Sequence, residues 1–92
     1  MSKTLKTLIL KRFHKLSTDE VKSFALMRQL PETAKQTENI LTFIQPLDPF
    51  KHDNLVYLFS YLRSILLDHE VAYIHQSLIE VIDSYHLIEL FD

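Results

Sequence analysis

Apolar side chains recur along this chain at three- and four-residue spacing, which is the repeat of an amphipathic helix. The first stripe lies within residues 3–16 and consists of Leu5, Leu8, Ile9, Phe13 and Leu16. A second helix is predicted to follow Ser17, which forms a capping-box pattern with Glu20. No segment alternates with a period of two, so we expect no strands.

Prolines divide the rest of the chain. Pro31 interrupts the second helical region, and a break there is favoured because proline inside a helix costs about 3 kcal/mol. One further stripe then runs to Gln45 and ends before Pro46; it consists of Ala34, Thr37, Ile40, Leu41 and Ile44. Asp48 and Pro49 have the pattern of an N-cap followed by the first helical residue.

Two longer helices are predicted in the C-terminal half. The first runs from Pro49 to about Leu67, with an inner stripe of Leu55, Leu58, Leu62 and Ile65. Asp68 is expected to cap the second, whose inner stripe is Val71, Ile74, Leu78, Val81, Tyr85 and Ile88. The short linkers favour antiparallel neighbours. The fold class predicted for residues 1–92 is therefore a single all-α domain, an antiparallel up-and-down four-helix bundle with a possible extra break at Pro31.

Composition removes many classes of chemistry. The chain has no cysteine and no glycine, which excludes disulfides, thiolate metal sites and glycine-rich phosphate loops. Its five histidines include no pair spaced three or four residues apart, so we expect no metal site. The serines fall at predicted caps or on predicted helix faces, and no catalytic arrangement is visible. We expect a binding protein with no cofactor, and not an enzyme.

Charge is divided between the two ends of the chain. Residues 1–35 hold eight basic residues against three acidic ones, whereas residues 36–92 hold two against nine. This split is compatible with basic and acidic helices packed side by side. The alternative is a basic N-terminal helix that contacts anionic lipid or the cytoplasmic side of a membrane protein. The net charge of −2 argues against nucleic acid as a partner.

No secretory signal or membrane span is expected. The N-terminal apolar stretch is broken at once by Lys11 and Arg12, and the longest apolar segment, residues 55–67, has 13 residues and contains Arg63. A membrane span needs about 20 residues. We therefore expect a cytoplasmic protein, with partial association with the inner face of the membrane as an alternative.

The helix that begins near Pro49 carries the candidate partner-binding residues. Tyr57 and Tyr61 are one turn apart, outside the inner stripe, and Asn54 lies one turn before them. Aromatic residues beside small polar ones are common where a surface meets a protein partner. The candidate site is Asn54, Tyr57, Tyr61 and Arg63. The alternative is that this helix is buried on most sides and that the tyrosines belong to the core.

Residues 47–82 resemble the immunity proteins of pediocin-like (class IIa) bacteriocins. The likeness lies in the Leu47-Asp48-Pro49 start, in the segment LVYLFSYL at residues 55–62 and in QSLI at residues 76–79. Chain length, the absence of cysteine and the basic N-terminal half agree with that family. Two features depart from it: the short segment after the last predicted helix, and the division at Pro31.

The resemblance implies a cytoplasmic four-helix bundle that protects a bacterium from a pore-forming peptide. In that family the partner is the membrane permease of the mannose phosphotransferase system with bacteriocin bound to it, and the C-terminal half decides which bacteriocin is recognised. Two other functions remain open from the residues alone. One is a small helical protein-interaction module or regulator of phage or plasmid type, and the other is a DNA-binding regulator.

Overall fold

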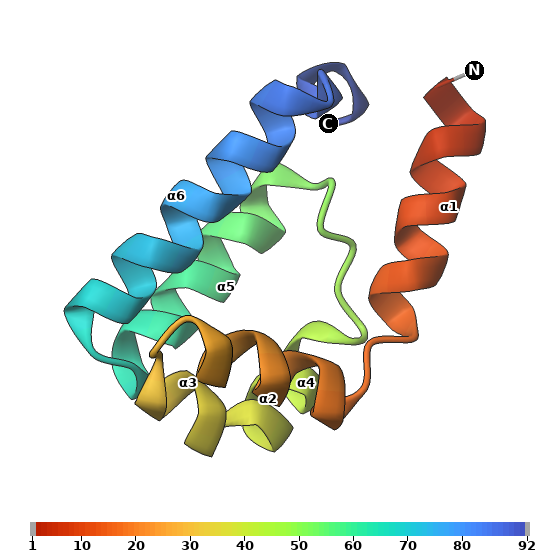
Figure 1. Ribbon diagram of the computed structural model, residues 1–92. Coiled ribbons are helices and arrows are strands. Elements are labelled where there is room, and N and C mark those ends of the chain that lie inside the picture. The colour runs from red at the N-terminus through yellow and green to blue at the C-terminus, as the bar shows by residue number, and fades with distance from the viewer. Residues whose placement is uncertain (1, 92) are drawn as a thin grey trace. The chain divides into compact units, whose positions relative to one another are not determined.

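The computed structural model describes residues 2–91, and all regular structure in that range is helical (Figure 1). The helices fall into two compact units, Met1–Leu47 and Asp48–Asp92. The expectation of an all-α protein is confirmed, whereas the single domain and the four-helix bundle stay predictions. Within residues 2–91, no helix combines the length and the apolar character that crossing a membrane requires.

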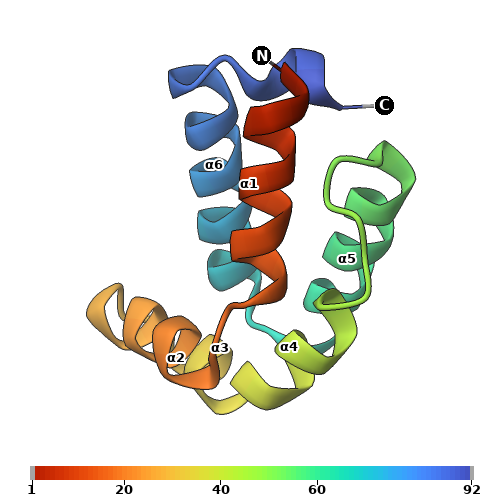
Figure 2. The ribbon, with the colours of Figure 1, turned by 90° about the vertical axis from the view of Figure 1, so that its right-hand side faces the viewer.

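In its described residues, 2–47, the first unit has four helices: α1 (Ser2–His14), α2 (Thr18–Met27), α3 (Pro31–Lys35) and α4 (Thr37–Ile44). Helices α2, α3 and α4 pack against one another. Helix α1 projects from this group in both views (Figures 1 and 2). The core of the unit therefore lies among α2, α3 and α4.

The start of α2 is the capping box that the sequence predicts. The Ser17 hydroxyl accepts a hydrogen bond from the backbone N–H of Glu20 at 3.2 Å. The Glu20 carboxylate accepts one from the backbone N–H of Ser17, also at 3.2 Å. Two N–H groups at the start of α2 are thereby satisfied.

The predicted break at Pro31 is confirmed, and Pro31 is the first residue of α3. Helix α2 ends before it because Gln29 adopts a left-handed conformation, with φ of 58°. This turn lets the N–H of Leu30 reach the carbonyl of Ala25 at 2.8 Å, which is the Schellman pattern of a helix end. Ala25 and Leu30 are both buried, so the turn is part of the core.

The stripe predicted after Pro31 is divided between two short helices. Thr37, Ile40, Leu41 and Ile44 are buried, as the sequence indicates. However, Gln36 separates α3 from α4. The Thr37 hydroxyl donates to the carbonyls of Thr33 at 3.1 Å and Ala34 at 2.9 Å, and such side-chain bonds to the preceding turn compete with regular helix geometry.

The second unit is an antiparallel helix pair followed by one short turn of helix. Helix α5 (His52–Ile65) is followed by α6 (Asp68–Ser84) after a two-residue linker, and the 3₁₀ helix η1 (Leu87–Leu90) follows α6 (Figure 1). The inner stripe predicted on α5 is partly correct: Leu62 is buried, whereas Leu55, Leu58 and Ile65 are half-buried. Phe59, which the prediction omitted, is also buried.

The predicted helix start at Asp48 and Pro49 is wrong. The Asp48 carboxylate accepts a hydrogen bond from the N–H of Phe50 at 2.9 Å, and the Asp48 carbonyl accepts one from the N–H of Lys51 at 3.2 Å. These bonds form a turn ahead of α5, because an aspartate followed by proline suits a turn as well as a helix cap. Phe50 is buried by this turn and packs edge-to-face on Phe91, with ring centroids 5.1 Å apart.

The predicted course of the last helix is also wrong at both ends. Asp68 is the first residue of α6 and not its cap. At the other end α6 stops at Ser84, and His86 adopts a left-handed conformation with φ of 54°. This reversal changes which side chains face inward: Tyr85 and Ile88 are 69% and 71% exposed, whereas Leu87 and Leu90 of η1 are buried. Val81, earlier in the same predicted stripe, is 46% exposed.

Candidate partner-binding site

The four candidate residues of α5 divide between two faces of the helix. Asn54, Tyr57 and Tyr61 follow one another at three- and four-residue spacing, which places them on one face. Arg63 comes two residues after Tyr61, and so about 200° further round the helix. The structure therefore brings three of the candidates together and separates Arg63 from them.

On the first face, Tyr57 is the residue with most of its side chain in solvent. It is 60% exposed, whereas Tyr61 and Asn54 are half-buried. The Asn54 amide donates to the carbonyl of Asp48 at 3.0 Å and so holds the turn before α5. Asn54 therefore has a structural role in the second unit, and its predicted contact with a partner stays a prediction.

Arg63 belongs to a groove between α5 and α6. We call the hollow of about 300 Å³ between these helices the α5/α6 groove. Its lining residues are His52, Leu55, Val56, Phe59 and Arg63 from α5, with His75, Leu78, Ile79 and Ile82 from α6. A neighbouring hollow of about 360 Å³ shares Phe59, Arg63 and His75 with it. The two hollows thus meet around these three side chains.

The floor of the groove is apolar, and two of its rings pack against each other. Phe59 is only 7% exposed, and its ring lies edge-on to His75 with centroids 5.2 Å apart and an interplanar angle of 82°. Val56 and Ile79, at the rim, are 52% and 38% exposed. Apolar hollows with a few polar groups at the edge are typical binding sites.

The charge of the groove differs from that of its unit. Residues 48–92 contain eight acidic and two basic residues. One of the two basic residues, Arg63, lines both hollows. Its guanidinium donates to the Ser60 hydroxyl at 3.4 Å, which keeps the cation beside the groove. The groove can therefore accept an apolar segment and offer a cationic donor at its edge.

The groove was not predicted from the sequence because each of its walls includes a second stripe of residues, outside the predicted inner stripe of that helix. Val56, Phe59 and Arg63 follow one another at spacings of three and four on α5, and His75 and Ile79 are four apart on α6. These spacings place each set on one face. The signal was thus present in the sequence, but the pairing of the two stripes depends on how α5 packs on α6.

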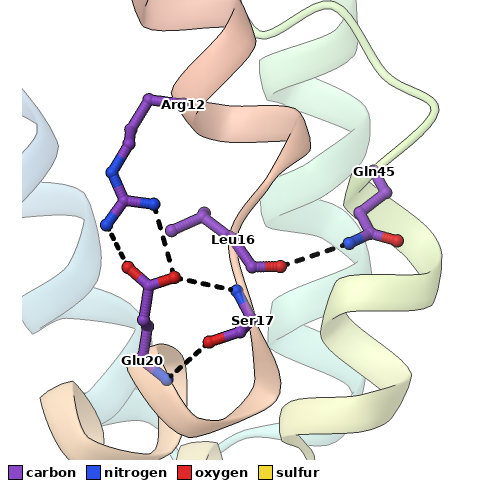
Figure 3. Close-up of polar contacts among 5 residues, drawn as sticks. All are labelled: Arg12, Leu16, Ser17, Glu20 and Gln45. Carbon is purple, nitrogen blue, oxygen red and sulfur yellow. Dashed lines mark hydrogen bonds and ion pairs between the residues drawn. The ribbon is translucent and has the colours of Figure 1, made fainter.

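A polar cluster in the first unit joins the end of α1 to α2 (Figure 3). The Arg12 guanidinium forms a double hydrogen bond and ion pair with the Glu20 carboxylate. The hydrogen bond from Arg12 lowers the pKa of Glu20 to about 2. The same hydrogen bond raises the pKa of Arg12. In the same cluster the Gln45 amide donates to the carbonyl of Leu16 at 3.3 Å.

The part of the chain that the structure describes contains no group of three His, Asp or Glu side chains placed to hold a metal ion. Comparison of the chain with protein-family models, with curated proteins and with solved structures gave no significant match.

Proposed function

We propose that this chain is a bacteriocin immunity protein that acts from the cytoplasm. It protects the cell from a pore-forming class IIa bacteriocin by binding the mannose-type permease to which the peptide is bound. No catalytic step and no cofactor form part of this proposal. The antiparallel four-helix bundle that the resemblance implies is its expected fold.

The observation that carries the proposal is the exposed apolar and aromatic surface of the second unit. The resemblance to immunity proteins lies almost entirely within that unit, in residues 47–82. Tyr57 on one side of α5 and the α5/α6 groove on the other are two exposed surfaces that a partner can contact. A binding protein needs such anchors, because a few well-packed side chains provide most of the binding energy.

The groove also suits a second candidate function, a helical interaction module that binds some other protein. An apolar groove between two helices accepts the apolar face of a partner helix, whatever the biological role of that partner. The two candidates differ in one observable: only an immunity protein protects a sensitive cell.

Protection tests the proposal directly. The full chain is expressed in a sensitive strain, and growth is measured against a panel of class IIa peptides. We expect resistance to at least one peptide. Tyr57→Ala, and separately the pair Val56→Ala and Ile79→Ala, should lower the tolerated peptide concentration about tenfold or more, since such anchors contribute about 1–3 kcal/mol.

The matched control is Tyr73→Ala. Tyr73 is 41% exposed on α6 and does not line the groove, so this variant should protect as the parent does. Circular dichroism of each variant establishes that the helices are retained. A folded parent chain that protects against no peptide of the panel would refute the immunity function and favour the general interaction module.

A further inference from the structure

Helix α1 carries no acidic residue, and the sequence has none before Asp19. Its exposed side includes a continuous strip of the helix, which we call the α1 outer face. That face consists of Thr4, Leu5, Leu8, Lys11, Arg12 and, just after the helix, Lys15. These positions fall within about 120° of one another around the helix axis. Cationic and apolar side chains are thus mixed on one face of a helix that has no acidic residue of its own.

Two leucines on this face lie in solvent. Leu5 is 43% exposed and Leu8 is 59% exposed. One exposed leucine requires no explanation. Two leucines beside lysines suit a helix that lies on a membrane surface, because the apolar side chains can enter the headgroup region while the lysine chains extend to the phosphates.

The opposite side of α1 is less exposed. Ile9, Leu10 and Phe13 are half-buried. Near the C-terminal end of α1, polar contacts connect it to its unit: Arg12 pairs with Glu20, and the His14 ring lies 3.4 Å from the carbonyl of Leu47. The more N-terminal turns, which carry both leucines, project from the α2–α4 group (Figure 2). The outer face can therefore lie on a flat surface without unfolding the unit.

We propose that the α1 outer face binds the surface of an anionic lipid bilayer. Lys11 and Lys15 are its principal cations, because Arg12 is already paired with Glu20. Nucleic acid is also anionic, but it provides no apolar layer for Leu5 and Leu8. This binding is independent of the proposed immunity function.

Vesicle sedimentation of the full chain tests the proposal. Vesicles of equimolar phosphatidylcholine and phosphatidylglycerol should bind the chain, binding should weaken as sodium chloride is added, and vesicles of phosphatidylcholine alone should bind it far less. The double variant Lys11→Gln and Lys15→Gln should bind about thirtyfold more weakly, since a basic residue near an anionic surface is worth about fivefold in affinity. Leu8→Ser should also reduce binding, because it removes the exposed apolar group.

The matched control is Lys22→Gln with Arg28→Gln, which removes the same charge from α2 and its C-terminal cap residue in the same unit. It should retain most of the binding.

The proposal would be overturned by equal binding to both kinds of vesicle, by equal losses in the two double variants, or by no binding at all. Binding of a labelled DNA duplex that depends on Lys11 and Lys15, in the absence of vesicle binding, would assign the face to nucleic acid instead. Loss of vesicle binding with intact protection, or the reverse, separates this proposal from the immunity function.

Discussion

Glycine is absent from this chain, so residues with side chains must take the left-handed conformations that end its helices. Gln29 does so after α2, and His86 after α6. The left-handed conformation costs a residue with a Cβ atom roughly 1–2 kcal/mol, and burial of the neighbouring residue offsets this cost. At Gln29 the neighbour is Leu30, which is 2% exposed, and at His86 it is Leu87, which is 7% exposed.

The ion pair between Arg12 and Glu20 makes the stability of the first unit depend on pH. The pKa of Glu20 in the folded chain is lowered from 4.5 to about 2. The stabilising effect of the carboxylate is therefore fully present above about pH 4.5 and is lost as the pH falls towards 2. Glu20→Gln keeps the capping pattern, because glutamine also serves at this position, and removes the charge.

Thermal melting of the parent and of Glu20→Gln at neutral pH and at about pH 2 measures this effect. We expect the parent to melt higher at neutral pH and the difference to shrink in acid. Arg12→Gln should reproduce the loss at neutral pH, because it removes the other partner. A difference between parent and variant that is equal at both pH values would show that the ion pair does not contribute.

At the scale of the element, the sequence was informative where a local pattern determines the structure. The Ser17 capping box, the break at Pro31 and the buried stripe of α4 all depend on residues within one or two turns. The helix starts at Asp48 and Asp68 were predicted wrongly because the same residue types also form turns or first helical residues. The turn at Asp48 accompanies the packing of Phe50 against Phe91, which lies forty-one positions further along the chain. A contact at that separation cannot be read from a local sequence pattern.

The end of α6 provides a test of the corrected course of the chain. Leu90→Ala should destabilise the protein by roughly 2–5 kcal/mol, as expected for a buried leucine, since Leu90 is 6% exposed. Ile88→Ala should change the free energy of unfolding by less than about 0.5 kcal/mol, because an exposed side chain loses little. Urea denaturation measures both. A larger loss for Ile88 would restore the original prediction, in which the stripe of α6 continues to that residue.

At the scale of the whole molecule, charge is divided between the two units. Residues 1–47 hold eight basic and four acidic residues, and residues 48–92 hold two and eight. The sequence predicted this division, and it predicted that α5 carries candidate partner residues. It could not predict that Arg63 lies on a different face of α5 from Tyr57, in a groove completed by α6, since the groove exists only once the two helices are packed.

We propose that the second unit of this chain selects the bacteriocin, as the C-terminal half does in the immunity proteins that it resembles. The most direct test exchanges residues 48–92 between this chain and a class IIa immunity protein of known specificity, with protection as the measurement. We predict that each hybrid protects against the bacteriocin matched to its C-terminal unit, and that Tyr57→Ala weakens protection by the hybrid that carries it. If folded hybrids protect according to their N-terminal half, or if the unit from this chain confers no protection on either background, the account is contradicted.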